Sequence, residues 1–262
     1  MDVREKARSF RALHTNGPLV LPNAWDPGSA VAIEATGAKA IATTSAGVSW
    51  ALGVPDGGGL TRGEAMGALR RIVAAVTVPV TADVEDGYGA VAETVTEVLA
   101  IGAVGVNLED SRGGVLVDPA EQEDLLAAAR EAGGADLVLN ARTDTFLTGA
   151  GSPAERLADT VVRAERYAAA GADVLFVPGL VDPVAIKELV GGPLPLSVMA
   201  FPGAPSVREL AELGVVRISV GSGIAQAAYG LAAAAARELL GAGTYGALED
   251  ALGYGELNDL LR

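Results

Sequence analysis

Short runs rich in valine, isoleucine and leucine alternate with longer mixed stretches along the whole chain. The apolar runs show little polar alternation, which is typical of strands that are covered on both faces. The pattern predicts eight strands, at Leu19–Pro22, Ala40–Thr44, Val78–Val84, Val104–Glu109, Leu137–Ala141, Val174–Val177, Leu194–Met199 and Val215–Val220.

The stretches between these runs have the length and punctuation of helices. Asp118-Pro119 and Ser152-Pro153 each place a capping residue before a proline, which is a good helix start. A glycine suited to a left-handed helix end follows four of the helices, at Gly37, Gly102, Gly171 and Gly214. The predicted helices are Gly28–Glu34, Thr61–Val76, Ala90–Ile101, Pro119–Ala132, Pro153–Ala170, Val184–Val190, Ser206–Leu213 and Gly223–Leu240, with one more before the first strand.

Eight strands, each followed by a helix, predict an α/β fold of the (βα)8 TIM-barrel type. The alternative is an open doubly wound sheet, but no GxGxxG motif opens a helix after the first strand. We expect one domain over residues 1–262, with 241–262 as a helical tail of one or two short helices. Such a tail packs on a neighbouring subunit or caps its own barrel.

Composition narrows the classes of function. Nineteen basic residues against 33 acidic ones give a net charge of −14, which argues against nucleic acid or an anionic membrane as partner. The chain has no cysteine, which excludes disulfides, thiolate metal sites and a cysteine nucleophile. The N-terminus lacks the apolar core of a signal peptide, and the longest alanine-rich run is too short to span a bilayer. We therefore expect a soluble, cytoplasmic protein.

Acidic residues gather where the third and fourth strands end, which is the end of a barrel that carries chemistry. Asp83 and Glu85 are two apart in a segment expected to be extended, so both carboxylates should point the same way, and Glu109 ends the next strand. Carboxylates that face one cavity repel each other unless a cation lies among them, and oxygen ligands suit Mg²⁺ or Mn²⁺. Alternatively, single acids such as Asp86 or Asp110 cap the helices that follow.

Arg142 ends the fifth strand, flanked by Asn140 and Asp144. A guanidinium at this place fits a substrate carboxylate, or it forms an internal ion pair with Glu109 or Asp144. The Thr43–Gly47 stretch offers small hydroxyls and backbone N–H groups, either as a carboxylate cradle or as an ordinary tight loop.

Several chemistries are disfavoured by the residues that are missing from strand ends. Lys6, Lys39 and Lys187 are the only lysines, and none lies at a C-terminal strand end, so a Schiff-base aldolase is not expected. The single histidine, His14, is expected in the N-terminal helix, which disfavours histidine-ligated zinc and a Ser-His-Asp triad. Gly221-Ser222-Gly223 is expected to form a turn after the last strand, and a phosphate-binding site is the alternative.

Five ordered motifs resemble the isocitrate lyase/phosphoenolpyruvate mutase superfamily. They are Pro-Asn-Ala-Trp-Asp (22–26), Thr-Thr-Ser-Ala-Gly-Val with Leu-Gly-Val-Pro-Asp (43–48 and 52–56), Asp-Val-Glu-Asp-Gly-Tyr-Gly (83–89), Asn-Leu-Glu-Asp (107–110) and Asn-Ala-Arg-Thr-Asp (140–144). The resemblance implies a barrel whose Mg²⁺ binds a small 2-oxo or 2-hydroxy carboxylate and stabilises its enolate. It also implies a homotetramer, a dimer of dimers that exchange a C-terminal helix.

The resemblance assigns roles residue by residue. It implies that the metal is held, directly or through water, by Asp83, Glu85 and Glu109, with Glu85 in place of a more usual aspartate. Asp56 matches an acid that contacts the metal's waters and the reacting group, and Arg142 would bind substrate. The substrate site would further be lined by Trp25, Asp26, Ser45, Ala46 and Gly47.

The segment after the fourth strand departs from the family pattern. Family lyases that cleave isocitrate or methylisocitrate carry a Lys-Lys-Cys-Gly-His loop there, whereas this chain has Ser-Arg-Gly-Gly-Val-Leu-Val-Asp (111–118). Mutases and phosphonopyruvate hydrolases carry an asparagine- and lysine-bearing gate, which is missing too. The corresponding segment of this chain, residues 111–118, is called the gate below, and its only functional groups are Ser111, Arg112 and Asp118.

Three functions remain open. The leading one is a Mg²⁺-dependent lyase that breaks a C–C bond beside a 2-oxo or 2-hydroxy carboxylate, as in an oxaloacetate-like decarboxylation or a retro-aldol cleavage, with Tyr88 as the proton donor if one is needed. The second is P–C bond chemistry of the mutase or phosphonopyruvate hydrolase kind, with Arg112 and Arg142 on the phosphoryl oxygens. The third is an inactive barrel that only binds carboxylates.

Overall fold

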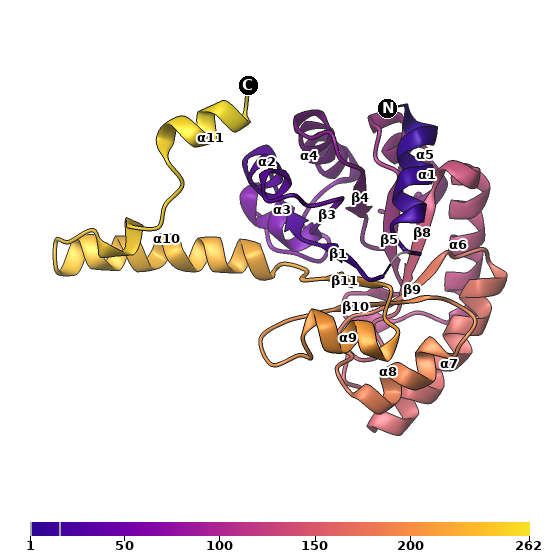
Figure 1. The fold of residues 1–262 in the computed structure, drawn as a ribbon. Helices are drawn as coiled ribbons and strands as arrows, with labels where there is room; N and C mark the ends of the chain where they lie inside the picture. Colours follow the sequence, from indigo (N-terminus) through magenta and orange to yellow (C-terminus); the bar gives the residue numbers. More distant parts are fainter. Residues whose placement is uncertain (1, 16) are drawn as a thin grey trace.

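The computed structural model describes residues 2–15 and 17–262, and its main sheet is a closed parallel barrel (Figure 1). The first barrel strand has two pieces, β1 (Leu19–Leu21) and β2 (Asn23–Ala24), because Pro22 has no N–H to continue the ladder. The barrel closes because β1 pairs with β11 and β2 pairs with β3. The other strands are β3 (Ile41–Thr43), β4 (Val80–Asp83), β5 (Gly105–Glu109), β8 (Val138–Arg142), β9 (Val174–Val177), β10 (Leu196–Met199) and β11 (Arg217–Ser219).

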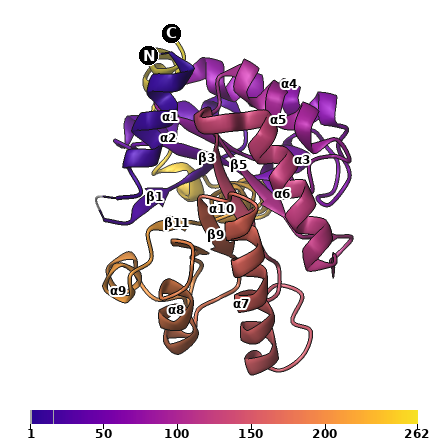
Figure 2. The ribbon, with the colours of Figure 1, turned by 90° about the vertical axis from the view of Figure 1, so that its right-hand side faces the viewer.

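Helices surround this barrel in the order that the sequence predicted (Figure 2). Gly37, Gly102, Gly171 and Gly214 all have positive φ, and Asp118 and Ser152 are both N-caps followed by proline, so these boundary predictions are confirmed. The helices are α1 (Val3–Ala12), α2 (Pro27–Ala35), α3 (Ser45–Ala51), α4 (Arg62–Ala75), α5 (Val91–Ile101), α6 (Pro119–Gly133), α7 (Pro153–Ala169), α8 (Pro183–Val190), α9 (Val207–Leu213), α10 (Gly223–Gly241) and α11 (Tyr254–Leu260). The predicted (βα)8 barrel is confirmed.

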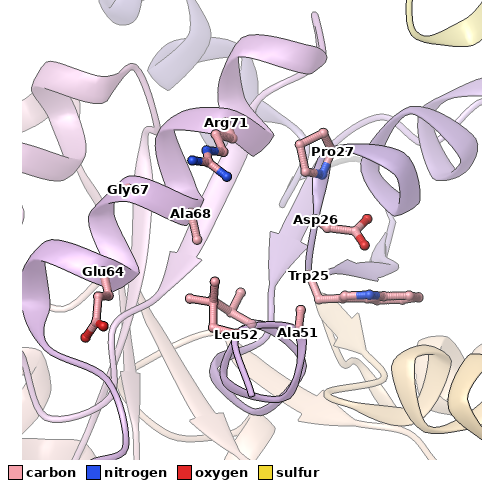
Figure 3. A pocket seen from close by; sticks show the side chains of 10 residues that line it. Trp25, Asp26, Pro27, Ala51, Leu52, Glu64, Gly67, Ala68 and Arg71 are labelled. Carbon is pink, nitrogen blue, oxygen red and sulfur yellow. The ribbon is translucent and has the colours of Figure 1, made fainter. Parts of the chain in front are cut away.

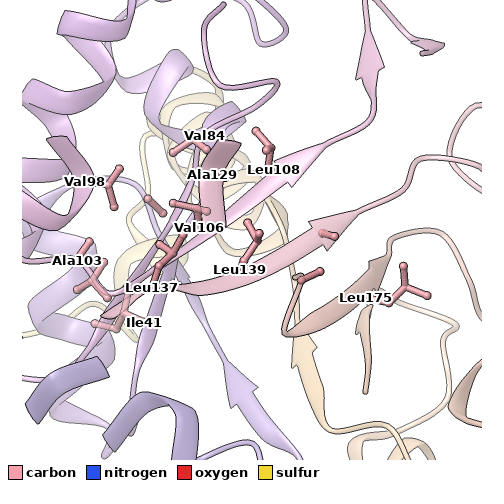
Figure 4. Close-up of a cluster of buried hydrophobic side chains, with 14 of the residues drawn as sticks. Ile41, Val84, Val98, Ala103, Val106, Leu108, Ala129, Leu137, Leu139 and Leu175 are labelled. Atoms are coloured by element: carbon pink, nitrogen blue, oxygen red, sulfur yellow. The ribbon is translucent and has the colours of Figure 1, made fainter. Parts of the chain in front are cut away.

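The strands turn their apolar residues outward, against the helices. Figure 4 shows Val106 and Leu108 of β5 beside Leu139 of β8, with Val98 and Ala129 of the covering helices close by. The residues between them in sequence therefore face the inside of the barrel. On β5 and β8 these inward residues become polar and then charged toward the C-terminal end, where the predicted chemistry lies.

Helix α1 closes the N-terminal end of the barrel. Phe10 is fully buried in a cluster with residues of β1, β3 and β8, and a Cβ built on Gly105 would lie 3.0 Å from its ring. His14 was expected within this helix, but α1 ends at Ala12 and His14 lies in the following turn, where its Nδ1 contacts the Phe10 carbonyl at 2.9 Å. Burial lowers the pKa of His14 to about 4, so it is a neutral packing residue at neutral pH.

Two segments differ from the expectation of simple loops. Residues Ser45–Ala51 form helix α3 with Thr44 as its N-cap, rather than the loop expected after the second strand. The gate folds as a small hairpin of β6 (Ser111–Arg112) and β7 (Val115–Leu116), whose turn is made by Gly113 and Gly114 with positive φ. Both segments lie beside the acidic strand ends.

Helix α10 projects away from the barrel, and the chain then returns toward α2 (Figure 1). Ala225 is the buried residue of this 19-residue helix. The tail after it contains a short 3-10 turn, Gly246–Leu248, and helix α11. In the part of the chain that the structure describes, no helix has the length and apolar character to cross a membrane.

Candidate active site

The strand register brings the predicted acids and the arginine to one end of the barrel. Asp83 of β4 is level with Asn107 of β5, and Glu109 of β5 is level with Arg142 of β8. Side chains level with each other on neighbouring parallel strands share a face, so these three charged groups enter the same space. The structure therefore groups the candidate residues that the sequence placed on separate strands.

Arg142 is the centre of an ion-pair network. Its Nε and Nη2 donate to the two oxygens of Asp144, at 2.7 and 3.0 Å, and its Nη1 lies 2.6 Å from Glu109 Oε2. Burial alone would lower the pKa of Arg142, but Asp144 and Glu109 outweigh burial and raise it. Both internal ion pairs considered for Arg142 exist at once, and they fix the orientation of the guanidinium.

Asp83 has one anchored oxygen and one free oxygen. Oδ2 accepts hydrogen bonds from the backbone N–H of Ser45 at 3.2 Å and from its hydroxyl at 3.0 Å. Oδ1 is buried without a hydrogen-bond partner and lies 4.0 Å from Arg142 Nη1. In this structure Ser45 orients Asp83, and its part in holding a substrate carboxylate stays a prediction.

Glu85 reaches the site by a different route from the one predicted. Strand β4 ends at Asp83, and Glu85 has a φ of 50°, so the expectation of an extended 83–85 segment is wrong. This left-handed turn buries the side chain, whose Oε2 accepts from the Gly58 N–H at 3.1 Å while Oε1 has no partner. Burial raises the pKa of Glu85, and the nearby Asp83 and Asp56 raise it further.

Glu109 is the most strongly perturbed carboxyl of the site. Burial raises its pKa to about 8; Arg142 opposes the shift, and Asp83, Asp144 and Glu85 add to it. Asp56 lies in the loop after α3, and its pKa is raised by desolvation and by Asp83. Several acids that raise one another's pKa have more negative charge than Arg142 neutralises, and this imbalance favours a bound cation.

Tyr88 lies beside the acids at a second non-glycine residue with positive φ, 55°. Burial raises the pKa of its phenol, and the charges of Glu85 and Asp83 raise it further. The phenol therefore stays protonated at neutral pH. Asp86, which was considered as a helix cap, accepts instead from the Tyr88 N–H at 3.0 Å and pairs with Arg112 at 3.1 Å.

Trp25 and Asp26 lie in a groove between α2, α3 and α4 (Figure 3). The groove has a volume of about 500 Å³, and neither the three acids of the barrel end nor Arg142 lines it. Asp26 is the N-cap of α2 and accepts from the Ser29 N–H at 2.6 Å. That these two residues line the substrate site stays a prediction, as does the carboxylate cradle at Ala46 and Gly47, which lie in the first turn of α3.

Sequence reasoning gave Asp144 too small a role and missed the part that Arg217 plays. Asp144 is the bidentate partner of Arg142, and Ser111 donates to the same carboxylate at 2.7 Å. Arg217 is only 1% exposed, and its guanidinium lies between Asn107, whose Oδ1 accepts from Nη2 at 2.9 Å, and the ring of Phe10. An arginine inside an otherwise apolar strand, Val215–Val220, is the signal that could have revealed it.

The residues present fit a divalent cation that is completed by outside ligands. Within residues 2–15 and 17–262, no three acidic or histidine side chains form a ready-made metal cage. Asp83 Oδ1 and Glu85 Oε1 are nevertheless buried carboxylate oxygens without partners, and such oxygens are costly unless a cation or water meets them. Mg²⁺ keeps waters and substrate oxygens in its shell, so few protein ligands suffice.

Comparison with known proteins agrees with the motifs. The family model for phosphoenolpyruvate phosphomutase matches residues 10–240. An uncharacterized protein of Mycobacterium tuberculosis is 40% identical over 217 residues, 82% of each chain. The 2-methylisocitrate lyase of Escherichia coli is 31% identical over 205 residues, which are 72% of this chain and 65% of the lyase.

Solved structures share the fold over nearly the whole chain. A putative lyase/mutase from Burkholderia cenocepacia is 36% identical, with a TM-score of 0.91 over 98% of this chain and 96% of that one. A phosphonopyruvate hydrolase in complex with oxalate and Mg²⁺ is 25% identical, with a TM-score of 0.85 over 99% and 95% of the two chains. On the family match and these relatives, the chain belongs to the isocitrate lyase/phosphoenolpyruvate mutase superfamily.

Proposed function

We propose that the protein is a Mg²⁺-dependent lyase that breaks a C–C bond next to the carboxylate of a small 2-oxo or 2-hydroxy acid. The observation that carries the proposal is the pair of buried, unpartnered oxygens, Asp83 Oδ1 and Glu85 Oε1, beside the fixed guanidinium of Arg142. A binding site for both a cation and a carboxylate needs these two features together. The phosphonopyruvate hydrolase of the same fold, solved with oxalate and Mg²⁺, supports the cation and carboxylate site but does not distinguish C–C from P–C chemistry.

In this proposal the chain's own residues bind and orient the substrate. Asp83 and Glu85, which each have a buried oxygen without a partner, would hold the metal together with Glu109, whose Oε2 is engaged by Arg142. When bound, Mg²⁺ supplies Lewis-acid stabilisation of the negative charge that develops on the substrate oxygens. Arg142 orients the carboxylate, and Tyr88, kept protonated by its surroundings, is the proton donor. Mn²⁺ would satisfy the same oxygen ligands.

The arginine contacts favour C–C over P–C chemistry. The P–C alternative needs Arg112 and Arg142 on the phosphoryl oxygens. Arg112 instead pairs with Asp86 and with Glu121 of α6, which leaves Arg142 alone of the two to bind an anionic substrate. A ³¹P NMR trace of phosphonopyruvate with enzyme and Mg²⁺ that shows a new phosphorus resonance would restore the alternative.

Calorimetric titration of oxalate, with and without Mg²⁺, tests the proposed site. We expect binding that depends on Mg²⁺ and is lost in Asp83→Asn, because this change removes the charge that the metal needs. Asp182→Asn, the same change at the N-cap of α8, is the matched control and should bind like the wild type. Tyr88→Phe should keep oxalate binding but lose turnover of the substrate, which a screen beginning with oxaloacetate would identify.

The competing outcomes are distinct. Mg²⁺-dependent oxalate binding without turnover on a broad panel of acids would support the inactive carboxylate-binding barrel. Equal oxalate affinity in the wild type and Asp83→Asn would contradict the metal site itself. The lyase proposal stands only if binding and turnover are both lost together with Asp83.

We also propose that the chain forms a homo-oligomer, a tetramer built as a dimer of dimers that exchange helix α10. Exposed apolar side chains of α10 support this, among them Leu231, Leu239 and Leu240. An apolar groove of about 800 Å³ lies between the ends of β1, β10 and β11, α9 and the start of α10, and Val20, Val207 and Ile218 are among the residues that line it. An exchanged helix would cover both apolar surfaces.

A further inference from the structure

Asp110 lies directly behind the site and is fully buried. It follows Glu109, the last residue of β5, so its side chain points away from the barrel interior and toward helix α7. Its backbone N–H donates to the Arg142 carbonyl at 3.2 Å, which joins it to the end of β8. A charged group at such a place needs partners, and the structure provides several.

The two carboxylate oxygens of Asp110 connect separate elements. Oδ1 accepts the backbone N–H of Asp144 at 2.9 Å. Oδ2 accepts from Arg163 Nη1 at 2.9 Å and from the Tyr167 hydroxyl at 2.7 Å, both on α7. The Asp110 carboxylate therefore connects Asp144, the ion-pair partner of Arg142, to helix α7 on the outside of the barrel.

The base of the gate hairpin is held by the Asp110 backbone and by Arg163, the ion-pair partner of the Asp110 carboxylate. The Asp110 carbonyl accepts the Val117 N–H at 2.9 Å, and Arg163 Nη2 donates to the Val117 carbonyl at 3.1 Å. Ser111, at the start of the hairpin, donates to Asp144 Oδ2. The Asp110 carboxylate therefore acts on Asp144 directly and on the gate hairpin through Arg163.

We propose that Asp110 is a positioning residue, which fixes the orientation of Arg142 through Asp144 while it holds the gate hairpin in register. The proposal rests on the proposed function, because it takes Arg142 as the group that receives the substrate carboxylate. Asp110 touches no substrate, and its effect passes through the Asp144 backbone. A misplacement of about 1 Å at a binding group is enough to weaken binding by large factors.

Asp110→Asn tests the proposal, and Asp173 is a control, because it accepts a backbone N–H near the start of β8 whereas Asp110 accepts one just after its end. Asp173 accepts the Leu139 N–H at 2.8 Å and pairs with Arg130 at 2.6 Å, so Asp173→Asn removes an equivalent charge far from the site. We expect Mg²⁺-dependent oxalate affinity to fall by about tenfold or more in Asp110→Asn. In Asp173→Asn it should stay within about twofold of the wild type, even if both variants lose thermal stability.

A second background separates positioning from general destabilisation. Arg142→Lys removes the bidentate fork, because an ammonium group cannot make both bonds to Asp144. If Asp110 acts through Arg142, Asp110→Asn should change oxalate affinity less than twofold in this background. The proposal would be overturned if Asp110→Asn lowered oxalate affinity as much in the Arg142→Lys background as in the wild type. It would also be overturned if Asp110→Asn alone left oxalate affinity unchanged.

Hydrogen exchange gives a readout that needs no ligand. We expect faster amide exchange in Asp110→Asn at Asp144, whose N–H the Asp110 side chain accepts, with no change at this amide in Asp173→Asn. Unchanged protection of the Asp144 amide would overturn the proposal. If the wild type fails to bind oxalate with Mg²⁺, the proposed function fails, and the exchange result still decides whether Asp110 holds Asp144.

Discussion

At the scale of single residues, Glu109 shows how burial and charge compete in this site. Its ion pair with Arg142 favours the ionised form, yet burial and the neighbouring acids prevail and raise its pKa to about 8. In the unfolded chain a glutamate has a pKa near 4.5. The native protein therefore holds a proton on Glu109 at pH values where the unfolded chain has released it.

This proton makes stability depend on pH in a predictable direction. Between about pH 4.5 and 8 the native state binds more protons than the unfolded state, so the free energy of unfolding falls as pH rises. Glu109→Gln should lose this slope, and Glu188→Gln, an exposed change on α8, should keep it. Thermal-unfolding midpoints from pH 5 to 8 in EDTA check this; parallel curves for wild type and Glu109→Gln would contradict it.

The sequence identified the types of residue in the site better than their contacts. Asp83, Glu109 and Arg142 could be predicted because strand-end positions in a barrel follow from the chain order alone. Glu85 came to the same place through a left-handed turn, which alternation along a strand does not describe. The partners of the acids were missed because the hydroxyl of Ser45 comes from the start of α3 and the backbone N–H of Gly58 from a loop, both distant in sequence from the acids.

At the scale of elements, the strands and long helices were predictable because each carries its own apolar pattern and caps. Helix α3 was not, since Ser-Ala-Gly-Val-Ser-Trp-Ala has little helix propensity, and the helix depends on packing. Gly47 shows this dependence, because a Cβ at that residue would lie 2.8 Å from Trp25 Cβ and 3.3 Å from Ala225 Cβ. The gate hairpin was missed because two residues per strand give no pattern.

The packing of α1 into the barrel gives a prediction for β5. A Cβ at Gly105 would lie 2.8 Å from Thr81 Oγ1 and 3.0 Å from the Phe10 ring, so Gly105→Ala should cost about 1–3 kcal/mol of unfolding free energy. Gly67→Ala on α4 meets nothing within 4 Å and should stabilise by about 0.5–1 kcal/mol. Urea unfolding of both variants checks the pair, and a Gly105→Ala protein as stable as the wild type would refute the tight fit.

At the scale of the whole molecule, the projecting helix α10 decides how the barrel is completed. In a monomer, its exposed leucines and the apolar groove along β1, β10 and β11 would both face water. We therefore expect sedimentation equilibrium to give the mass of a tetramer at micromolar concentration. Deletion of residues 223–262 should reduce the species to a less stable monomer, whereas a monomeric full-length protein would exclude helix exchange.

The left-handed backbone at Glu85 has a consequence for how this protein can change over generations. A non-glycine residue with φ near 50° costs about 1 kcal/mol, which glycine would not cost. In a population selected only for thermal tolerance, and not for enzyme turnover, replacement of Glu85 by glycine should therefore be among the first substitutions to be selected. If such a population kept glutamate at position 85, the function of this carboxylate in the site would still be under selection.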